Sequence, residues 1–375
     1  MSQTIRGRVV TADGIIEAGA VRIEAGRIAE VGTADGSDDS QDGDTESAWI
    51  LPGFVDIHVH GGGGHTFTTG DPAEARRAAA FHARHGTTTL LASLVTAPYE
   101  LMRAATTAFA PLIADATLAG IHYEGPYLSL ARCGAQNPAY LRDPDLGELE
   151  TLLGLGGIRV VTVAPELPQA IAAIRMLVAH GVVAAIGHTD ATYEQALAAL
   201  DAGASLGTHV CNAMRPIHHR DPGPIVALLD DRNAVCEQVA DGVHLHDGML
   251  RHVVRAAGPN RVALVTDAMA AAGMPDGAYE LGGQSVDVRG GVARLTQDGS
   301  IAGSTLTMDA ALRQVIHSGV DIVRAAAMAS TTPANVLGLS AEVGRIATGL
   351  RADLVLLDDE LRVAGVLRAG QPYPS

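Results

Sequence analysis

The sequence contains no lysine: all 26 basic residues among its 375 positions are arginine. Three kinds of site depend on a lysine amine and are therefore excluded. These are the phosphate-binding P-loop, a Schiff-base nucleophile and a carbamylated lysine that bridges two metal ions. Metal and acid–base chemistry must then use histidines and carboxylates, and any anionic ligand must be bound by arginine, by histidine or by the backbone.

Other residue types are also scarce. Aromatic residues make up 3% of the chain and hydrophobic residues 47%, so the core must consist mainly of small aliphatic side chains, as in layered α/β folds. The three cysteines (Cys133, Cys211 and Cys236) are an odd number without a paired spacing, which is typical of a reducing compartment. No apolar run approaches the ~20 residues of a membrane span, and we expect a cytoplasmic protein. A net charge of −16 argues against nucleic acid or an anionic membrane as a partner.

Two patterns divide the chain. At both ends, short strand-like segments are separated by glycine turns, and we expect residues 1–51 and 341–375 to form one small β-sandwich domain. Between them, in residues 52–340, apolar strand-like segments alternate with alanine-rich helical segments, which predicts an α/β fold, a TIM-like (β/α)8 barrel. The eight predicted barrel strands are 50–60, 87–94, 118–124, 158–164, 182–188, 205–209, 234–240 and 262–267. Helices are predicted at 72–84, 168–180, 192–202 and 246–257.

A doubly wound sheet is the alternative architecture. It would need a G-x-G-x-x-G turn after its first strand to bind a dinucleotide phosphate. Four glycines lie there, at 61–64, but position 66 is threonine, so the barrel is favoured.

Polar residues end several of the predicted strands. In the first strand, alternation puts Asp56, His58 and His60 on one face, where two imidazoles can grip one metal ion. Four further residues each end a different strand: Glu124, His188, His209 and Asp267. The C-terminal ends of barrel strands converge on the rim that carries the active site, so we expect these side chains to meet there. Histidines on helices and in loops, such as His82, are expected at the surface instead.

Longer motifs accompany these residues. They are PGFVDIHVH at 52–60, HYEGP at 122–126, GHTD at 187–190, TH at 208–209 with NAM at 212–214, DGVH at 241–244, TDA at 266–268 and AGSTLTM at 302–308. On these motifs, which span nearly the whole chain, the sequence resembles the amidohydrolase superfamily and, within it, the N-acetylglucosamine-6-phosphate deacetylase family.

The resemblance implies metal-dependent hydrolysis of the N-acetyl group of N-acetylglucosamine 6-phosphate to glucosamine 6-phosphate and acetate, in amino sugar catabolism and cell-wall recycling. It implies one or two divalent ions per subunit, with zinc and iron as candidates. Glu124, His188 and His209 would hold the tighter ion, and His58 and His60 would hold a second one together with Glu124 and Asp267. Many related enzymes bridge two ions with a carbamylated lysine, and the family places Glu124 in that position.

The resemblance also assigns further roles. Asp267 would be the general acid and base, and Gln136, where part of the family has a histidine, would donate a hydrogen bond to the oxyanion. Arg220 would bind the phosphate and reach the neighbouring subunit of a homodimer, although taken alone it is equally explained as a solvated loop residue. The full set of substrate-binding residues is Ala135, Gln136, Asn212, Ala213, Arg220, Asp241, His244, Ile301, Ala302 and Gly303.

Two other functions compete with this interpretation. A related amidohydrolase could act on another N-acyl sugar or amino acid, and an uncharged substrate would make Arg220 dispensable. A catalytically inactive barrel could serve as a binding protein, but such proteins typically lose ligands, whereas every ligand position is filled here.

Overall fold

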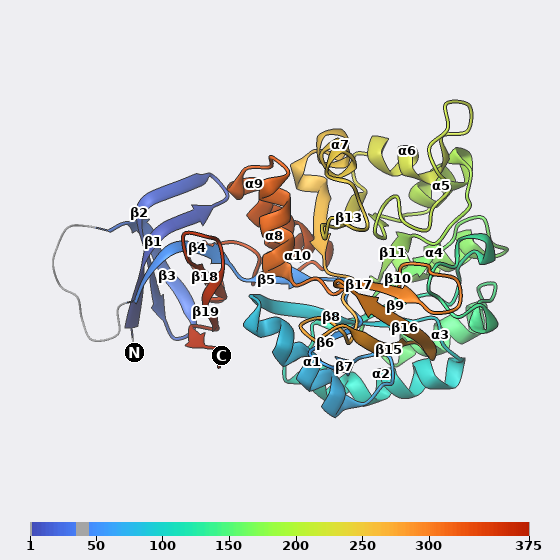
Figure 1. The fold of residues 1–375 in the computed structure, drawn as a ribbon, viewed down its shortest axis with the longest axis horizontal. Coiled ribbons are helices and arrows are strands. Elements are labelled where there is room, and N and C mark those ends of the chain that lie inside the picture. Colours follow the sequence, from blue (N-terminus) through green and yellow to red (C-terminus); the bar gives the residue numbers. More distant parts are fainter. Residues whose placement is uncertain (1, 35–44, 375) are drawn as a thin grey trace.

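A computed structural model describes residues 2–34 and 45–374, in which a barrel is joined to a smaller β-sheet body (Figure 1). The barrel sheet has eight strands in the order β5-β8-β9-β10-β11-β12-β13-β14, and every pair along it is parallel. These strands are β5 (Phe54–Asp56), β8 (Thr87–Val95), β9 (Gly120–Glu124), β10 (Ile158–Val163), β11 (Val183–Ile186), β12 (Leu206–Gly207), β13 (Val235–Val239) and β14 (Val262–Val265). The prediction of a (β/α)8 barrel is confirmed.

The first and last barrel strands are joined just beyond their ends. The backbone N–H of Asp267 donates to His58 O at 2.8 Å, and His60 N–H donates to Ala268 O at 2.8 Å. We call this junction between the ends of β5 and β14 the seam. On its inside, the Thr266 hydroxyl donates to the buried carboxylate of Asp56 at 2.6 Å. The seam therefore lies at the rim where the polar residues were expected.

The predicted strand 50–60 is wrong in its extent. Residues 45–52 form β4 (Thr45–Pro52), which belongs to the smaller sheet, and only Phe54–Asp56 enters the barrel. The division falls at Gly53, whose N–H donates to Asp353 O and where a Cβ would lie 2.3 Å from the Thr88 hydroxyl. Because both contacts come from distant parts of the chain, the local apolar pattern could not reveal the break.

The helices surround the barrel (Figure 1). Local signals set several of their boundaries: Asp71 caps α1 by accepting the N–H groups of Ala73 and Glu74, and Thr192 forms a capping box with Gln195 at the start of α5. The helices are α1 (Pro72–Arg84), α2 (Tyr99–Ala114), α3 (Leu146–Gly154), α4 (Ala170–Ala179), α5 (Tyr193–Asp201), α6 (Gly223–Asp230), α7 (Asp247–Ala257), α8 (Met308–His317), α9 (Ile322–Ala326) and α10 (Thr332–Val336), with a π-helical turn, η4 (Ala327–Thr331), before α10. Among the described residues, no helix combines the length and apolar character that crossing a bilayer requires.

Both ends of the chain meet in one seven-stranded sheet (Figure 1), which confirms the predicted β-domain. Its order is β20-β19-β18-β4-β1-β2-β3, from β1 (Ser2–Thr11), β2 (Gly14–Glu24), β3 (Arg27–Thr33), β4, β18 (Leu354–Leu357), β19 (Val363–Arg368) and β20 (Gln371–Pro372). A bridge between Arg27 and Arg351 brings β3 back toward the C-terminal segment, around a separate apolar core that includes Ile5, Val21 and Leu354. The residue limits 1–51 and 341–375 stay a prediction.

A small antiparallel sheet follows β14 and was not predicted. It consists of β15 (Gly277–Leu281), β16 (Gln284–Arg289) and β17 (Val292–Leu295) and has its own apolar cluster. From β16, Gln284 donates to Ala135 O, so this sheet packs on the loop after β9. A two-stranded ribbon, β6 (Gly61–Gly62) and β7 (His65–Thr66), follows the first barrel strand.

Candidate active site

Glu124, His188 and His209 form one group of converging polar atoms. Glu124 Oε1 lies 2.9 Å from His188 Nε2 and 3.0 Å from His209 Nε2, and these two nitrogens are 3.1 Å apart. All three side chains are buried. Glu124 is the last residue of β9, whereas each histidine lies two residues beyond its strand, β11 or β12.

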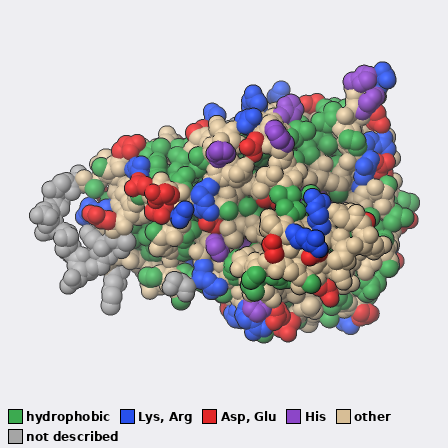
Figure 2. Space-filling model, in the orientation of Figure 1, with side chains coloured by type: hydrophobic (Ala, Val, Ile, Leu, Met, Phe, Trp, Pro, Cys, Tyr) green, Lys and Arg blue, Asp and Glu red, His purple; other side chains and the backbone are tan. Residues whose placement is uncertain are grey.

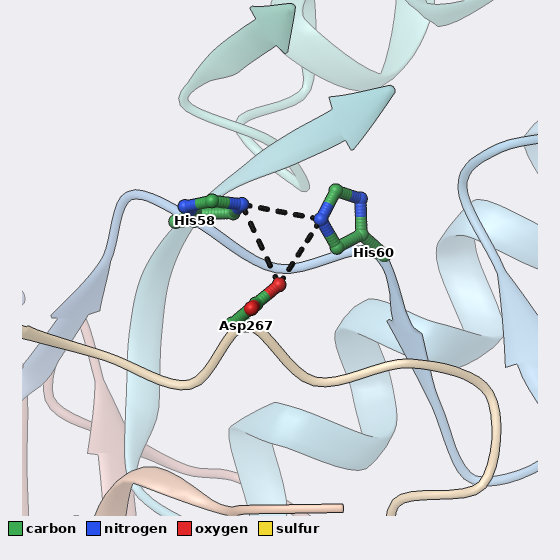
Figure 3. Close-up of side chains that lie close together, drawn as sticks. All are labelled: His58, His60 and Asp267. Carbon is green, nitrogen blue, oxygen red and sulfur yellow. Dashed lines mark hydrogen bonds and ion pairs between the residues drawn. The ribbon is translucent and has the colours of Figure 1, made fainter. Parts of the chain in front are cut away.

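His58, His60 and Asp267 form the second group (Figure 3). His58 Nε2 lies 3.1 Å from His60 Nε2, and Asp267 Oδ1 lies 3.5 Å and 3.2 Å from the two nitrogens. Glu124 touches this group as well, because its Oε2 is 3.1 Å from His60 Nε2 and its Oε1 is 3.4 Å from His58 Nε2. Glu124 therefore contacts both groups through one carboxylate.

The nitrogen geometry fits a divalent cation. His58 Nδ1 faces the Glu237 carboxylate at 3.0 Å, and the Nδ1 atoms of His60 and His188 face the backbone oxygens of Ser93 and Arg132. Such acceptors select the tautomer that carries its proton on Nδ1 and leaves a lone pair on Nε2. Two nitrogen lone pairs 3.1 Å apart repel each other unless a cation or a proton lies between them. Buried imidazole and carboxylate donors of this kind suit Zn²⁺ or Fe²⁺.

The buried charges perturb one another. Burial lowers the pKa of His58, but the charges of Glu124, Asp267 and Glu237 outweigh that effect and hold it well above the usual range. Burial raises the pKa of Asp267, yet His58 and His60 bring it down to about 2. Burial likewise acts against ionisation of Glu124, and the neighbouring histidines lower its pKa well below the usual range. Both carboxyl groups are therefore ionised at neutral pH.

Several residues of the site have left-handed backbone conformations. The φ angles are +46° at His188, +27° at His209, +49° at Asp267, +87° at Cys211 and +48° at Ala213. Non-glycine residues adopt this region at a cost of roughly 1–3 kcal/mol each, and such strain is concentrated at functional sites. At His188, His209 and Asp267, the left-handed conformation turns the chain away from the strand direction. This explains why β11, β12 and β14 end two residues before the positions predicted from the apolar pattern.

A cavity of about 360 Å³ opens above the two groups. Of the residues predicted to contact a substrate, Ala135, Gln136, Asn212, Ala213, His244, Ile301 and Gly303 line it, together with His60, Glu124, His188, His209 and Asp267. The remaining predicted residues do not. Ala302 is buried between two lining residues, and Asp241 accepts the Nδ1 proton of His244 at 2.7 Å.

Arg220 lies outside the cavity of its own chain. Arg220 is exposed in the loop before α6. This loop projects from the barrel in Figure 1, and a group of histidine and arginine side chains lies on it in Figure 2. Arg132 lines the cavity and was not predicted; it is the one arginine on the cavity wall within the described part of the chain. Its Nε donates to Asp190 Oδ1 at 2.8 Å, and Arg215 donates to the other oxygen of that carboxylate at 3.0 Å.

Two more buried groups escaped the sequence analysis. Glu237, on β13, lies behind His58, and nothing in the pattern of that strand, which also carries Gln238, marked it out. His82 was expected at the surface, but it is fully buried and its Nε2 donates to Gly61 O at 2.8 Å. That expectation was wrong because the ribbon of β6 and β7 covers one face of α1, a tertiary contact that helix periodicity does not report.

The amidohydrolase family profile matches residues 49–372 of this sequence. The chain belongs to the amidohydrolase family. Among curated proteins, it is 37% identical to an N-acetylgalactosamine-6-phosphate deacetylase of Escherichia coli O157:H7, over 99% of both chains. It is 36% identical to an N-acetylglucosamine-6-phosphate deacetylase of Lysinibacillus sphaericus, over 97% of this chain and 95% of that one. A solved structure of the same kind of enzyme from Mycobacterium smegmatis, a mutant in complex with N-acetyl-D-glucosamine-6-phosphate, is 45% identical, with a TM-score of 0.95 over 100% of this chain and 99% of that one.

Proposed function

We propose that this protein hydrolyses the N-acetyl group of N-acetylglucosamine 6-phosphate to glucosamine 6-phosphate and acetate. The observation that carries the proposal is the pair of buried ligand groups that both contact Glu124 and most of whose members line one cavity. The relatives named above, which remove acetyl groups from hexosamine 6-phosphates, support the choice of substrate.

In this proposal, Glu124, His188 and His209 hold a divalent ion, and His58, His60 and Asp267 can hold another. A divalent cation supplies Lewis acidity, which polarises the amide carbonyl and makes water acidic enough to react at neutral pH. Asp267 is placed to take up the water proton, because its carboxylate is ionised and lines the cavity. The same carboxyl then returns the proton to the departing amine, which is a poor leaving group as an anion.

Two side chains support this chemistry from the cavity wall. Gln136 donates from Nε2 to Glu124 Oε2 at 2.7 Å, and one hydrogen of its amide remains for the substrate. The His244 ring stands 3.8 Å from Asp267 Oδ2 and is held by Asp241, so it can contact the sugar.

The phosphate is assigned to the part of the cavity wall formed by Asn212, Ala213 and Arg132. The backbone N–H of Ala213 has no acceptor among the described residues, and the guanidinium of Arg132 supplies the positive charge that a dianion needs. In the homodimer that we propose, Arg220 from the projecting loop adds a second guanidinium to the neighbouring site.

Zinc or iron, in one or two ions per subunit, suits the nitrogen and carboxylate ligands. The three cysteines are free thiols, which supports the proposed cytoplasmic location.

The direct test compares kcat/KM for acetate release from N-acetylglucosamine 6-phosphate, its C4 epimer N-acetylgalactosamine 6-phosphate, and unphosphorylated N-acetylglucosamine, using metal-loaded enzyme. We expect the first substrate to be hydrolysed fastest and the unphosphorylated sugar at least ~100-fold more slowly, since the sugar lacks the charge-assisted contacts. Equal values with and without phosphate would refute a sugar-phosphate substrate, and a faster epimer would reassign the enzyme to the galacto series.

A further inference from the structure

Glu237 is a buried carboxylate for which the mechanism above has no use. It is fully buried on β13, and its side chain points into the barrel behind the two ligand groups. Its Oε2 receives two bonds, from His58 Nδ1 at 3.0 Å and from the backbone N–H of His209 at 3.1 Å. Its Oε1 has no hydrogen-bond partner among the described residues. An ionised carboxylate in such a position is costly unless a positive charge lies close by.

His58 differs from the other three ligand histidines in this contact. His60 and His188 face neutral backbone oxygens with Nδ1, and the Nδ1 atom of His209 has no partner in the described chain. Of the four, His58 alone has a carboxylate on its Nδ1 side. A carboxylate on Nδ1 fixes the ring orientation, keeps the proton on Nδ1, and makes Nε2 a stronger donor to a metal ion.

The balance of charges around the ligand histidines also favours a second cation. Three carboxylates, Glu124, Asp267 and Glu237, surround the ligand histidines, and no arginine of the described chain lies within ion-pair distance of any of them. One divalent ion beside Glu124 offsets two of these three charges. A second ion between His58, His60 and Asp267 would more than offset the one charge that remains.

We propose that Glu237 is the positioning residue for a second divalent cation, which it stabilises through His58 in the group formed by His58, His60 and Asp267. The proposal rests on the metal-dependent function given above. It predicts that this chain holds two ions per subunit and that the charge of Glu237 is required for one of them only.

Glu237→Gln is the informative variant, because it keeps the shape and an acceptor oxygen for His58 but removes the charge. Gln238→Met is the matched control: Gln238 is the next residue on β13, is equally buried, and donates to Glu237 O rather than to the ligand side chains. His60→Asn gives the reference value for a chain that has lost the second ligand group. Thermal unfolding of each variant establishes that it folds.

Metal-free protein is loaded with Zn²⁺ at fixed free concentrations, and bound zinc is measured by elemental analysis and by competition with a chelating dye. We expect two ions in the wild type and in Gln238→Met, and one in His60→Asn. In Glu237→Gln, we expect the weaker ion to bind ~10–100-fold less tightly, with the tighter one unaffected. Activity should recover when free zinc is raised, as an affinity defect predicts.

Several results would overturn the proposal: one ion in the wild type, two ions of unchanged affinity in Glu237→Gln, or loss of both ions in a folded Glu237→Gln protein. If Glu237→Gln does not fold, Glu237→Asp, which keeps the charge but shortens its reach, must weaken the second ion alone. A wild type that holds two ions but releases no acetate refutes the proposed function and leaves the role of Glu237 intact.

Discussion

Gln136 Nε2 lies 2.7 Å from Glu124 Oε2 and donates a hydrogen bond to it. The other end of the same amide accepts the backbone N–H of Thr96 at 2.7 Å, so the side chain cannot turn over without losing both bonds. Gln136 therefore orients the carboxylate that touches both ligand groups, in addition to the substrate contact predicted for it. A hydrogen bond to a charged acceptor contributes about 1.5–3 kcal/mol.

Replacing Gln136 with leucine should lower kcat by roughly 10–100-fold, which is the kinetic equivalent of losing that bond. Gln136→Glu should be worse, because a second carboxylate would face Glu124. Steady-state acetate release, with bound metal measured on the same samples, checks both. Wild-type kcat in Gln136→Leu would mean that the bond has no catalytic consequence.

Asp267→Asn removes the group that is proposed to move the proton but keeps its size. We expect kcat to fall by a factor of about 10²–10⁴, the usual contribution of a general acid or base, while the ion held by Glu124, His188 and His209 remains bound. Substrate affinity measured by calorimetry should change little. An asparagine variant with normal turnover would show that the proton passes elsewhere.

Arg132→Met should weaken only the contact with the phosphate group of the substrate. Loss of a charge-assisted contact predicts a fall in kcat/KM of at least ~10-fold for N-acetylglucosamine 6-phosphate and little change for the unphosphorylated sugar. Arg103→Met is the control, because Arg103 is an exposed arginine on α2 whose ion-pair partner is Glu100. If both substrates lose activity equally, Arg132 serves the structure of the loop rather than the phosphate.

His82 makes the fold sensitive to acid. Burial, the largest effect, lowers its pKa from 6.5 to about 4, so the folded protein keeps this ring neutral while the unfolded chain protonates it. Since the unfolded state binds the extra proton between pH 6.5 and 4, stability is lost as pH falls through that window, by about 2 kcal/mol between pH 7 and 5.

His82→Gln should remove that part of the pH dependence, although it also costs some stability at pH 7 through altered packing. Unfolding free energies at pH 7 and pH 5 would be compared for wild type, His82→Gln and His317→Gln, in which an exposed histidine is replaced. Identical pH dependence in wild type and His82→Gln would contradict the assignment.

The sequence was most informative where local chemistry sets the structure. Helix α1 begins and ends at the residues that the helical pattern over 72–84 predicted, and the barrel follows from the alternation of buried strands with helices. The ends of the predicted strands indicated the candidate ligand residues that the fold brings together, and the family motifs added their proposed roles. Contacts between distant segments could not be read in this way: Gly53 divides two sheets because of Asp353 and Thr88, and Glu237 meets His58 only when the seam closes the barrel and brings β13, the neighbour of β14, close to the end of β5.

The seam between β5 and β14 has a consequence for how the site comes into being. His58 and His60 follow the first barrel strand and Asp267 follows the last, and the backbone bonds that join these strands run through the same residues. More than 200 positions of chain must therefore be translated and packed before the second ligand group exists. A chain that ends before Asp267 therefore lacks one member of this group and the backbone bonds that hold the other two in place, so the site is completed only after the last barrel strand has been added.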